Sequence, residues 1–148
     1  MADDLYDVDF VAWTEAQAAA LRARRSGANA LDYDNLAEEI EDLGKSEQYS
    51  CESYVENIIE HLLKIEFARS AETLPHWRGE VVAFRSNLER RLTRTIEHRI
   101  QERLAKLFAN AKRSIVVRDL PVAALPDVLP YTWEQIVDTD WYPEHRGV

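Results

Sequence analysis

Apolar residues recur along most of this chain at three- and four-residue intervals, the spacing of amphipathic helices, and no stretch shows the two-residue alternation of a strand. The pattern predicts four main helices, at about 9–26, 34–70, 76–92 and 95–117. After several prolines, Thr132 and Gln135 form a capping box that opens one short helix. We therefore expect an all-α protein.

The second predicted helix is the longest, because no proline interrupts it, and a rise of about 1.5 Å per residue makes it roughly 50 Å long. Its apolar residues stay within a sector of about 100° for many turns. Val55, Ile59 and Leu63 widen this stripe in the second half, which should be the more deeply buried end. The stripe consists of Leu36, Ile40, Leu43, Cys51, Tyr54, Ile58, Leu62 and Ile65.

The apolar stripe of the third and fourth helices changes phase near Thr93 to Thr95. One straight helix cannot bury both stripes in the same direction, so two helices joined by a bend or short break are expected there. The first helix should bury Phe10, Trp13, Ala20 and Leu21, with Gly27 in the position that commonly follows a helix end.

The predicted architecture is an up-and-down bundle of about four main helices around one long central helix, with a short C-terminal helix. A chain of this length is most simply one domain, here 1–148. Within it we expect an N-terminal arm over 1–8, the bundle over 9–118, and a proline-bounded C-terminal segment over 119–148.

Charge changes this picture, because the net charge of −9 hides two segments of opposite sign. The charged residues of 32–60 are almost all acidic and those of 78–118 are mostly basic, so ion pairs between the two segments are expected. The acidic total argues against general adhesion to nucleic acid or anionic lipid. The lone Cys51 and the absence of a long apolar run predict a cytoplasmic protein without a membrane span.

An acidic ridge lies on the second helix, where Glu52, Glu56 and Glu60 repeat at four-residue spacing and repel one another. Three kinds of partner could offset that repulsion. They are solvent with counterions, the arginine-rich third or fourth helix, and a divalent metal or a basic protein.

The sequence contains no signature of nucleotide binding, zinc proteolysis or hydrolysis, and its four histidines do not have metal-pair spacing. We therefore assign no catalytic, cofactor-binding or metal-ligating residue and expect no cofactor. His61 projects from the apolar stripe, which is usual for a core histidine bonded to a carbonyl or a carboxylate. The alternative is an acid–base residue or ligand in a polar site with Glu47 and His98.

Gly44 stands in the segment EEIEDLGKSE, near the edge of the buried sector of the second helix. A missing side chain there would let a neighbouring helix or the C-terminal tail approach closely. The same periodicity turns Leu43 and Glu47 toward the bundle, so Glu47 should find an arginine or a backbone donor.

Aromatic residues gather near the C-terminus, at Tyr131, Trp133, Trp141 and Tyr142. They could form a peptide groove or seal the tail onto the bundle.

Three segments resemble a known family in order and spacing: LYDVDFVAWTEAQAAALRARR, LDYDNLAEEIEDLGKSE followed by HLLKIEF, and LPYTWEQIVDTDWYPE. The family is the bacterial domain of unknown function 29. The resemblance implies an all-helical cytoplasmic protein, with no established activity, substrate or cofactor.

The favoured function is a non-enzymatic interaction or assembly protein of the bacterial cytoplasm, acting as a homodimer or with another protein. One alternative is an enzyme or metal-binding protein with a polar site between helices. The other is a regulator that contacts nucleic acid through the basic helices.

Overall fold

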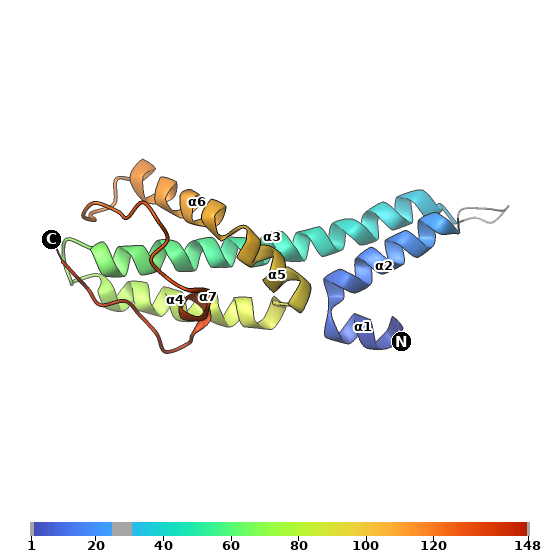
Figure 1. Cartoon of the computed structure of the whole chain (residues 1–148), viewed down its shortest axis with the longest axis horizontal. Coiled ribbons are helices and arrows are strands. Elements are labelled where there is room, and N and C mark those ends of the chain that lie inside the picture. Colours follow the sequence, from blue (N-terminus) through green and yellow to red (C-terminus); the bar gives the residue numbers. More distant parts are fainter. Residues whose placement is uncertain (1, 25–30, 148) are drawn as a thin grey trace. The chain divides into compact units, whose positions relative to one another are not determined.

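The computed structural model describes residues 2–24 and 31–147, and within them the chain forms seven helices and no strand (Figure 1). The expected all-α class is confirmed. The predicted end of the first helix, at Ser26 with Gly27 beyond it, lies outside the described residues. The helices are α1 (Ala2–Val8), α2 (Phe10–Ala23), α3 (Tyr33–Phe67), α4 (Leu74–Arg91), α5 (Arg94–Glu102), α6 (Leu104–Val117) and α7 (Trp133–Val137).

The helix boundaries follow the hydrophobic pattern closely. The long helix α3 runs unbroken for 35 residues, and the break between α4 and α5 falls at Leu92 and Thr93, where the stripe changes phase. A further break at Arg103, between α5 and α6, was not predicted, and neither a glycine nor a proline marks it. The expected N-terminal arm forms helix α1.

The chain divides into two compact units. Unit 1 comprises Met1–Cys51 with Leu92–Arg99, and unit 2 comprises Glu52–Arg91 with Ile100–Val148. Helix α3 therefore gives its first part to unit 1 and its second part to unit 2.

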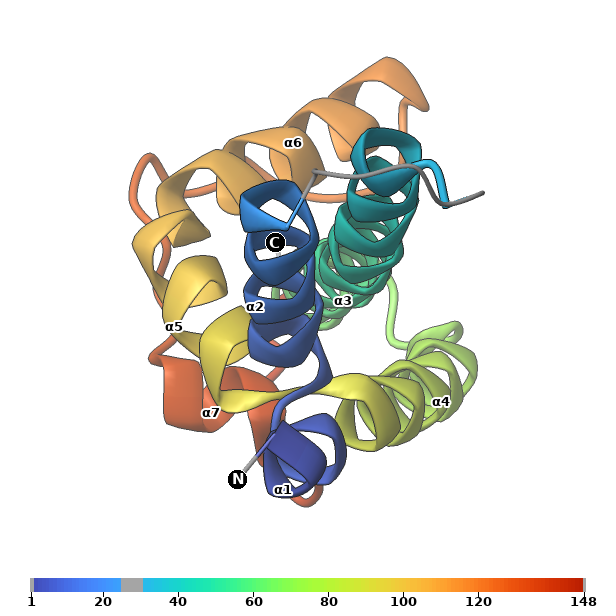
Figure 2. The ribbon, with the colours of Figure 1, turned by 90° about the vertical axis from the view of Figure 1, so that its right-hand side faces the viewer.

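In unit 1, α2 and the first part of α3 form an antiparallel hairpin that both views of the ribbon show (Figures 1 and 2). The buried positions along the hairpin carry mostly small side chains, which allow helix axes to approach closely. At Gly44 even a single added Cβ would overlap the Oγ1 atom of Thr14. The predicted close approach at Gly44 is confirmed, and α2 is the element that makes it. The buried residues are Val11, Thr14 and Ala18 of α2, and Ala37, Gly44 and Cys51 of α3.

We call this line of small residues between α2 and α3 the seam. Because the two helices meet along it, the buried face of each helix differs from the predicted one. Leu43 is 55% exposed and Leu36 is 39% exposed, so their predicted burial is wrong. On α2, Phe10 and Trp13 are only half-buried, because the seam follows their smaller neighbours. Hydrophobicity alone favoured the larger residues, whereas close helix packing is decided by small ones.

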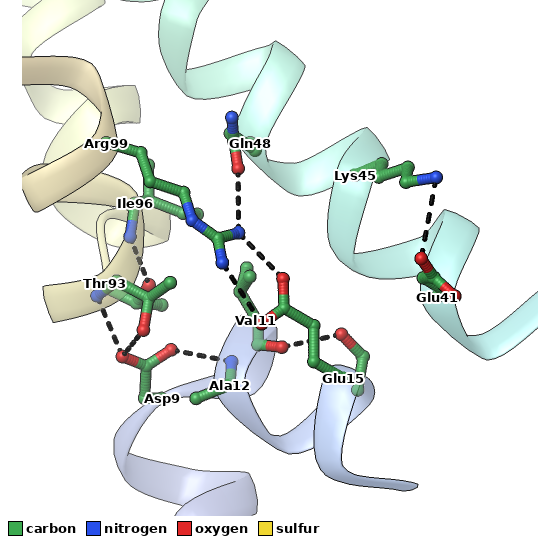
Figure 3. Close-up of polar contacts among 12 residues, drawn as sticks. Asp9, Val11, Ala12, Glu15, Glu41, Lys45, Gln48, Thr93, Ile96 and Arg99 are labelled. Carbon is green, nitrogen blue, oxygen red and sulfur yellow. Dashed lines mark hydrogen bonds and ion pairs between the residues drawn. The ribbon is translucent and has the colours of Figure 1, made fainter. Parts of the chain in front are cut away.

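Asp9 joins two helix starts within unit 1 (Figure 3). One carboxylate oxygen accepts the backbone N–H of Ala12 at 3.0 Å, and the other accepts both the N–H of Thr95 at 2.9 Å and its hydroxyl at 2.7 Å. Burial alone would raise the pKa of Asp9, but these hydrogen bonds outweigh it and hold the pKa below its usual range. The same side chain thus caps α2 and fixes α5 against it.

Arg99 adds a second polar tie within unit 1, also visible in Figure 3. Its guanidinium lies 2.8 Å from a carboxylate oxygen of Glu15 on α2 and donates to the side chain of Gln48 on α3 at 3.2 Å. One arginine in the last turn of α5 therefore contacts both arms of the hairpin.

In unit 2, the second part of α3 lies between α4 and α6, and its apolar residues form the core (Figures 1 and 2). Ile58, Ile59, Leu62, Leu63 and Ile65 are all fully buried, which confirms that this end of α3 is the deeper one. The wide stripe predicted this, because a helix surrounded by neighbours is apolar on most of its faces.

The C-terminal segment closes unit 2 over the end of α3 and over α4. The backbone N–H of Ala123 donates to the carbonyl of Phe67 at 2.7 Å, and the backbone N–H of Arg146 donates to the carbonyl of Glu66 at 2.9 Å. The predicted capping box at Thr132 is present and begins α7. The buried Arg85 of α4 donates to the carbonyls of Gln135 and Ile136 at the end of α7.

Replacing Gly44 by alanine should destabilise the protein by about 1–2 kcal/mol, because the clash with Thr14 exceeds the gain of about 1 kcal/mol in helix propensity. Gly44→Leu should cost more. Chemical denaturation measures both. Gly79→Ala is the matched control, because a Cβ there meets nothing within 4 Å, and it should stabilise α4. Adding Thr14→Ala should rescue Gly44→Ala; a purely additive double variant would contradict the clash.

Asp9→Ala should lower the free energy of unfolding by about 1–4 kcal/mol, since it removes the caps of two helices at roughly 0.5–2 kcal/mol each. Amide hydrogen exchange should speed up at both Ala12 and Thr95. Asp7→Ala, which changes an exposed acid of α1, provides the control. Faster exchange confined to α2 would show that Asp9 does not hold α5.

Candidate functional site

Five charged or titratable side chains lie buried on the second part of α3, inside unit 2. A buried charge is unfavourable unless it is paired and hydrogen-bonded, so the partners of these groups define the site. The five residues are Glu52, Glu60, His61, Lys64 and Glu66, each with no more than 6% of its surface exposed.

The acidic ridge is met by arginines at the two ends of α6. Arg118, which caps the C-terminus of α6, donates to Glu60 at 2.8 Å, and Lys64 lies 3.6 Å from the same oxygen. Arg103, just before α6, places its Nε atom 2.5 Å from Glu52, although the angle is not that of a hydrogen bond. Two of the three ridge acids, Glu52 and Glu60, therefore pair with arginines of the basic segment, as one of the three alternatives expected.

Glu56, between these two acids, is half-buried. Burial raises its pKa, and a hydrogen bond from Asn110 partly opposes that rise.

His61 is the core histidine that the sequence predicted. Its Nδ1 atom lies 2.7 Å from the carbonyl of Asn57, to which an N–H at that position donates, and its ring meets the edge of Phe84 at 5.1 Å between centroids. Its Nε2 atom contacts a carboxylate oxygen of Glu80 on α4 and lies 3.3 Å from the Nζ atom of Lys64.

The two contacts of Nε2 require different protonation states of the imidazole ring. A neutral imidazole that donates from Nδ1 can accept from Lys64 but cannot donate to Glu80, whereas the protonated ring can donate to Glu80 only. Burial lowers the pKa of His61, the charge of Lys64 lowers it further, and Glu80 partly opposes both. Burial also lowers the pKa of Lys64, whose ammonium lies 5.1 Å from the centre of the Trp77 ring.

The alternative of a polar site with Glu47, His61 and His98 stays a prediction from the sequence. His61 belongs to unit 2, where its contacts are with Asn57, Lys64, Glu80 and Phe84. Glu47 is half-buried and His98 is exposed, and both belong to unit 1. Among the described residues, no group of three His, Cys, Asp or Glu side chains is placed to hold a metal ion.

Sequence reasoning missed the partners that complete this cluster. Neither Glu80 nor Lys64 was predicted as a partner of His61, although Lys64 follows His61 at a spacing of three residues on one helix face. Glu66 was also missed, and its position within the apolar run LLKIEFA was the available signal for a buried acid.

Two exposed surfaces combine apolar residues with charges of opposite sign. The leucine face of α3 consists of Leu36, Ile40 and Leu43, and Glu39 and Glu47 flank Leu43 one helical turn away on either side. The valine face of α6 consists of Arg113, Val116 and Val117, on a helix that contains no acidic residue. Val116 is 69% exposed and Val117 is 77% exposed.

No helix in the described part of the chain combines the length and the apolar character that crossing a membrane would require.

Comparison with known proteins agrees with the fold and the sequence motifs. The profile of the family described as Domain of unknown function DUF29 matches residues 5–142, and the chain belongs to this family. A solved structure from Rhodospirillum rubrum ATCC 11170, described as an alpha-helical protein of unknown function, is 30% identical. The match covers 92% of this chain and 90% of that one, with a TM-score of 0.75. No curated protein matches the chain.

The lowered pKa of His61 predicts a pH dependence of stability. In the unfolded chain the histidine has a pKa near 6.5, above its value in the fold, so its stabilising contribution is complete above pH 6.5. As pH falls below 6.5 the unfolded state binds the proton first, and the free energy of unfolding decreases. Urea denaturation at about pH 7.5 and about pH 5.5 should therefore show a larger loss in wild type than in His61→Gln.

His98→Gln is the control for this comparison, because His98 is exposed and belongs to unit 1. It should keep the pH response of the wild type. A gain of stability on acidification that His61→Gln abolishes would mean that the Glu80 carboxylate governs the imidazole instead.

Proposed function

We propose that the protein is a non-enzymatic interaction and assembly protein, and that its partner is a second copy of the same chain. The observation that carries the proposal is the complementarity between the leucine face of α3 and the valine face of α6. Each face holds large apolar side chains in solvent, and their surrounding charges are opposite.

The apolar component supports a real but modest association. Burying an exposed leucine or valine side chain is worth roughly 1.5–3 kcal/mol when burial is complete. Two or three such side chains on each face can hold a reversible contact, although association also costs translational and rotational freedom.

The charges determine which faces of two copies pair. Residues 34–47 include six acids and one lysine, Lys45, which lies 3.7 Å from Glu41 and is therefore engaged within α3. Two leucine faces would repel each other, whereas a leucine face meets Arg113 on the valine face. We therefore infer contact between unlike faces of two copies. Such contacts close into a dimer or continue along a series of copies, according to the rotation between them.

The pairing of the basic residues favours this function over nucleic-acid binding. Four arginines of the basic segment already contact groups of their own unit, which reduces the positive surface left for phosphates. These are Arg85, Arg99, Arg103 and Arg118. We also place the protein in the cytoplasm, a proposal supported by its single cysteine, Cys51, which is buried and has no second cysteine in the chain to bridge to.

Analytical ultracentrifugation tests the proposal. Wild type should self-associate at concentrations on the order of 100 µM in about 50 mM salt, and less so in about 500 mM salt, because the charges are solvent-exposed. Leu43→Asp and Val116→Asp should each abolish association without changing the melting temperature. Val128→Asp, at a residue that is 77% exposed but outside both faces, is the matched control.

Mixing the two variants separates the possible pairings. Leu43→Asp keeps its valine face and Val116→Asp keeps its leucine face, so the mixture should form a heterodimer although neither variant associates alone. Association of Val116→Asp by itself would mean that leucine faces pair with each other. A wild type that stays monomeric at all concentrations would overturn the proposal.

A further inference from the structure

A cavity of about 590 Å³ lies in unit 2, where the C-terminal segment crosses the end of α3. Three aromatic side chains line it, together with two acids and one arginine. They are Tyr131, Trp141, Tyr142, Glu66, Glu144 and Arg146. Aromatic faces combined with carboxylates are the usual surroundings of a bound organic cation.

Glu66 is the buried anion of this cavity, with only 6% of its side chain exposed. One carboxylate oxygen accepts the hydroxyl of Tyr131 at 2.8 Å. Burial, together with the neighbouring Glu66, raises the pKa of Tyr131, so this hydroxyl keeps its proton and acts as a fixed donor. The other oxygen of Glu66 requires a cation or a second donor.

Arg146 provides that cation, with its Nε atom 2.6 Å from the carboxylate of Glu66. Yet 71% of the Arg146 side chain is exposed, so the anion is buried while its counter-ion lies largely in solvent. An exposed side chain keeps its alternative rotamers and its hydration, and such a contact is readily exchanged.

The aromatic rings of this cluster already pack against guanidinium groups. The guanidinium of Arg85 lies 5.1 Å from the centre of the Tyr142 ring, and that of Arg78 lies 5.9 Å from it. Tyr131 and Trp141 meet edge to face at 5.5 Å, which holds the orientation of these two walls.

We propose that this cavity is a binding site for a guanidinium or alkylammonium group of another molecule. The cation takes the place of the Arg146 side chain against Glu66 and packs on Tyr131 and Trp141. Arg146 is then an internal competitor, which keeps the buried carboxylate neutralised while the site is empty of ligand. This site is independent of the leucine and valine faces, and neither proposal requires the other.

Removing the competitor tests the site directly. Ethylguanidinium is the probe, and ethylurea, which has the same shape without the charge, is the control, both at constant ionic strength. The readout is the NMR shift of the Trp141 indole N–H, assigned with Trp141→Phe. Arg146→Ala should bind ethylguanidinium at least about tenfold more tightly than wild type does, and should not respond to ethylurea.

Matched variants locate the effect. In Arg146→Ala with Glu66→Gln, the ethylguanidinium response should disappear; if that double variant fails to fold, Arg146→Ala with Trp141→Leu replaces it and should weaken binding. Arg118→Ala exposes Glu60, another buried acid that loses its exposed arginine but lies outside the cavity. It should show no shift at Trp141.

The source of the cation is distinguished by comparing ethylguanidinium with acetyl-arginine amide, a mimic of an arginine within a polypeptide. Tighter binding of the second identifies a protein ligand, and equal binding identifies a free small cation. Equal affinity of wild type and Arg146→Ala for ethylguanidinium, or no saturable binding up to the order of 100 mM, would overturn the proposal.

Discussion

The second part of α3 buries charge, and unit 2 is arranged around the need to neutralise it. Glu52, Glu60, His61, Lys64 and Glu66 all lie on one helix that neighbours surround. A buried charge without a partner would cost several kcal/mol, so each neighbouring element must present a complementary group at one position. Arg103 and Arg118 do this at the two ends of α6, Glu80 does it from α4, and Tyr131 with Arg146 does it from the C-terminal segment.

These pairs specify geometry more than they add stability. An apolar core tolerates a helix that shifts by part of a turn, because leucine and isoleucine contacts have little direction. Ion pairs and hydrogen bonds to fixed atoms do not tolerate the same shift, since a displaced partner leaves a buried charge unmatched. The position of α6 along α3 is thus determined by two arginines, and that of the C-terminal segment by Glu66.

In unit 1, by contrast, the helices pack against each other through small residues. Gly44 and Thr14 allow α2 and α3 to meet closely, and Asp9 ties the start of α5 to the start of α2. The close seam leaves Leu36 and Leu43 outside. The exposure of these two leucines therefore creates the surface through which we propose that copies associate.

The sequence by itself determined the all-α class, the long unbroken α3, the break before α5 and the capping box of α7, because each depends on neighbours within one or two helical turns. It also identified His61 as a core histidine and Gly44 as a point of close approach. Only the tertiary structure decided which face of each hairpin helix is buried, since a glycine and a threonine on different helices must meet for the seam to exist. It likewise decided which acids are paired, because Glu60 and Arg118, or Glu66 and Arg146, become neighbours only through the fold.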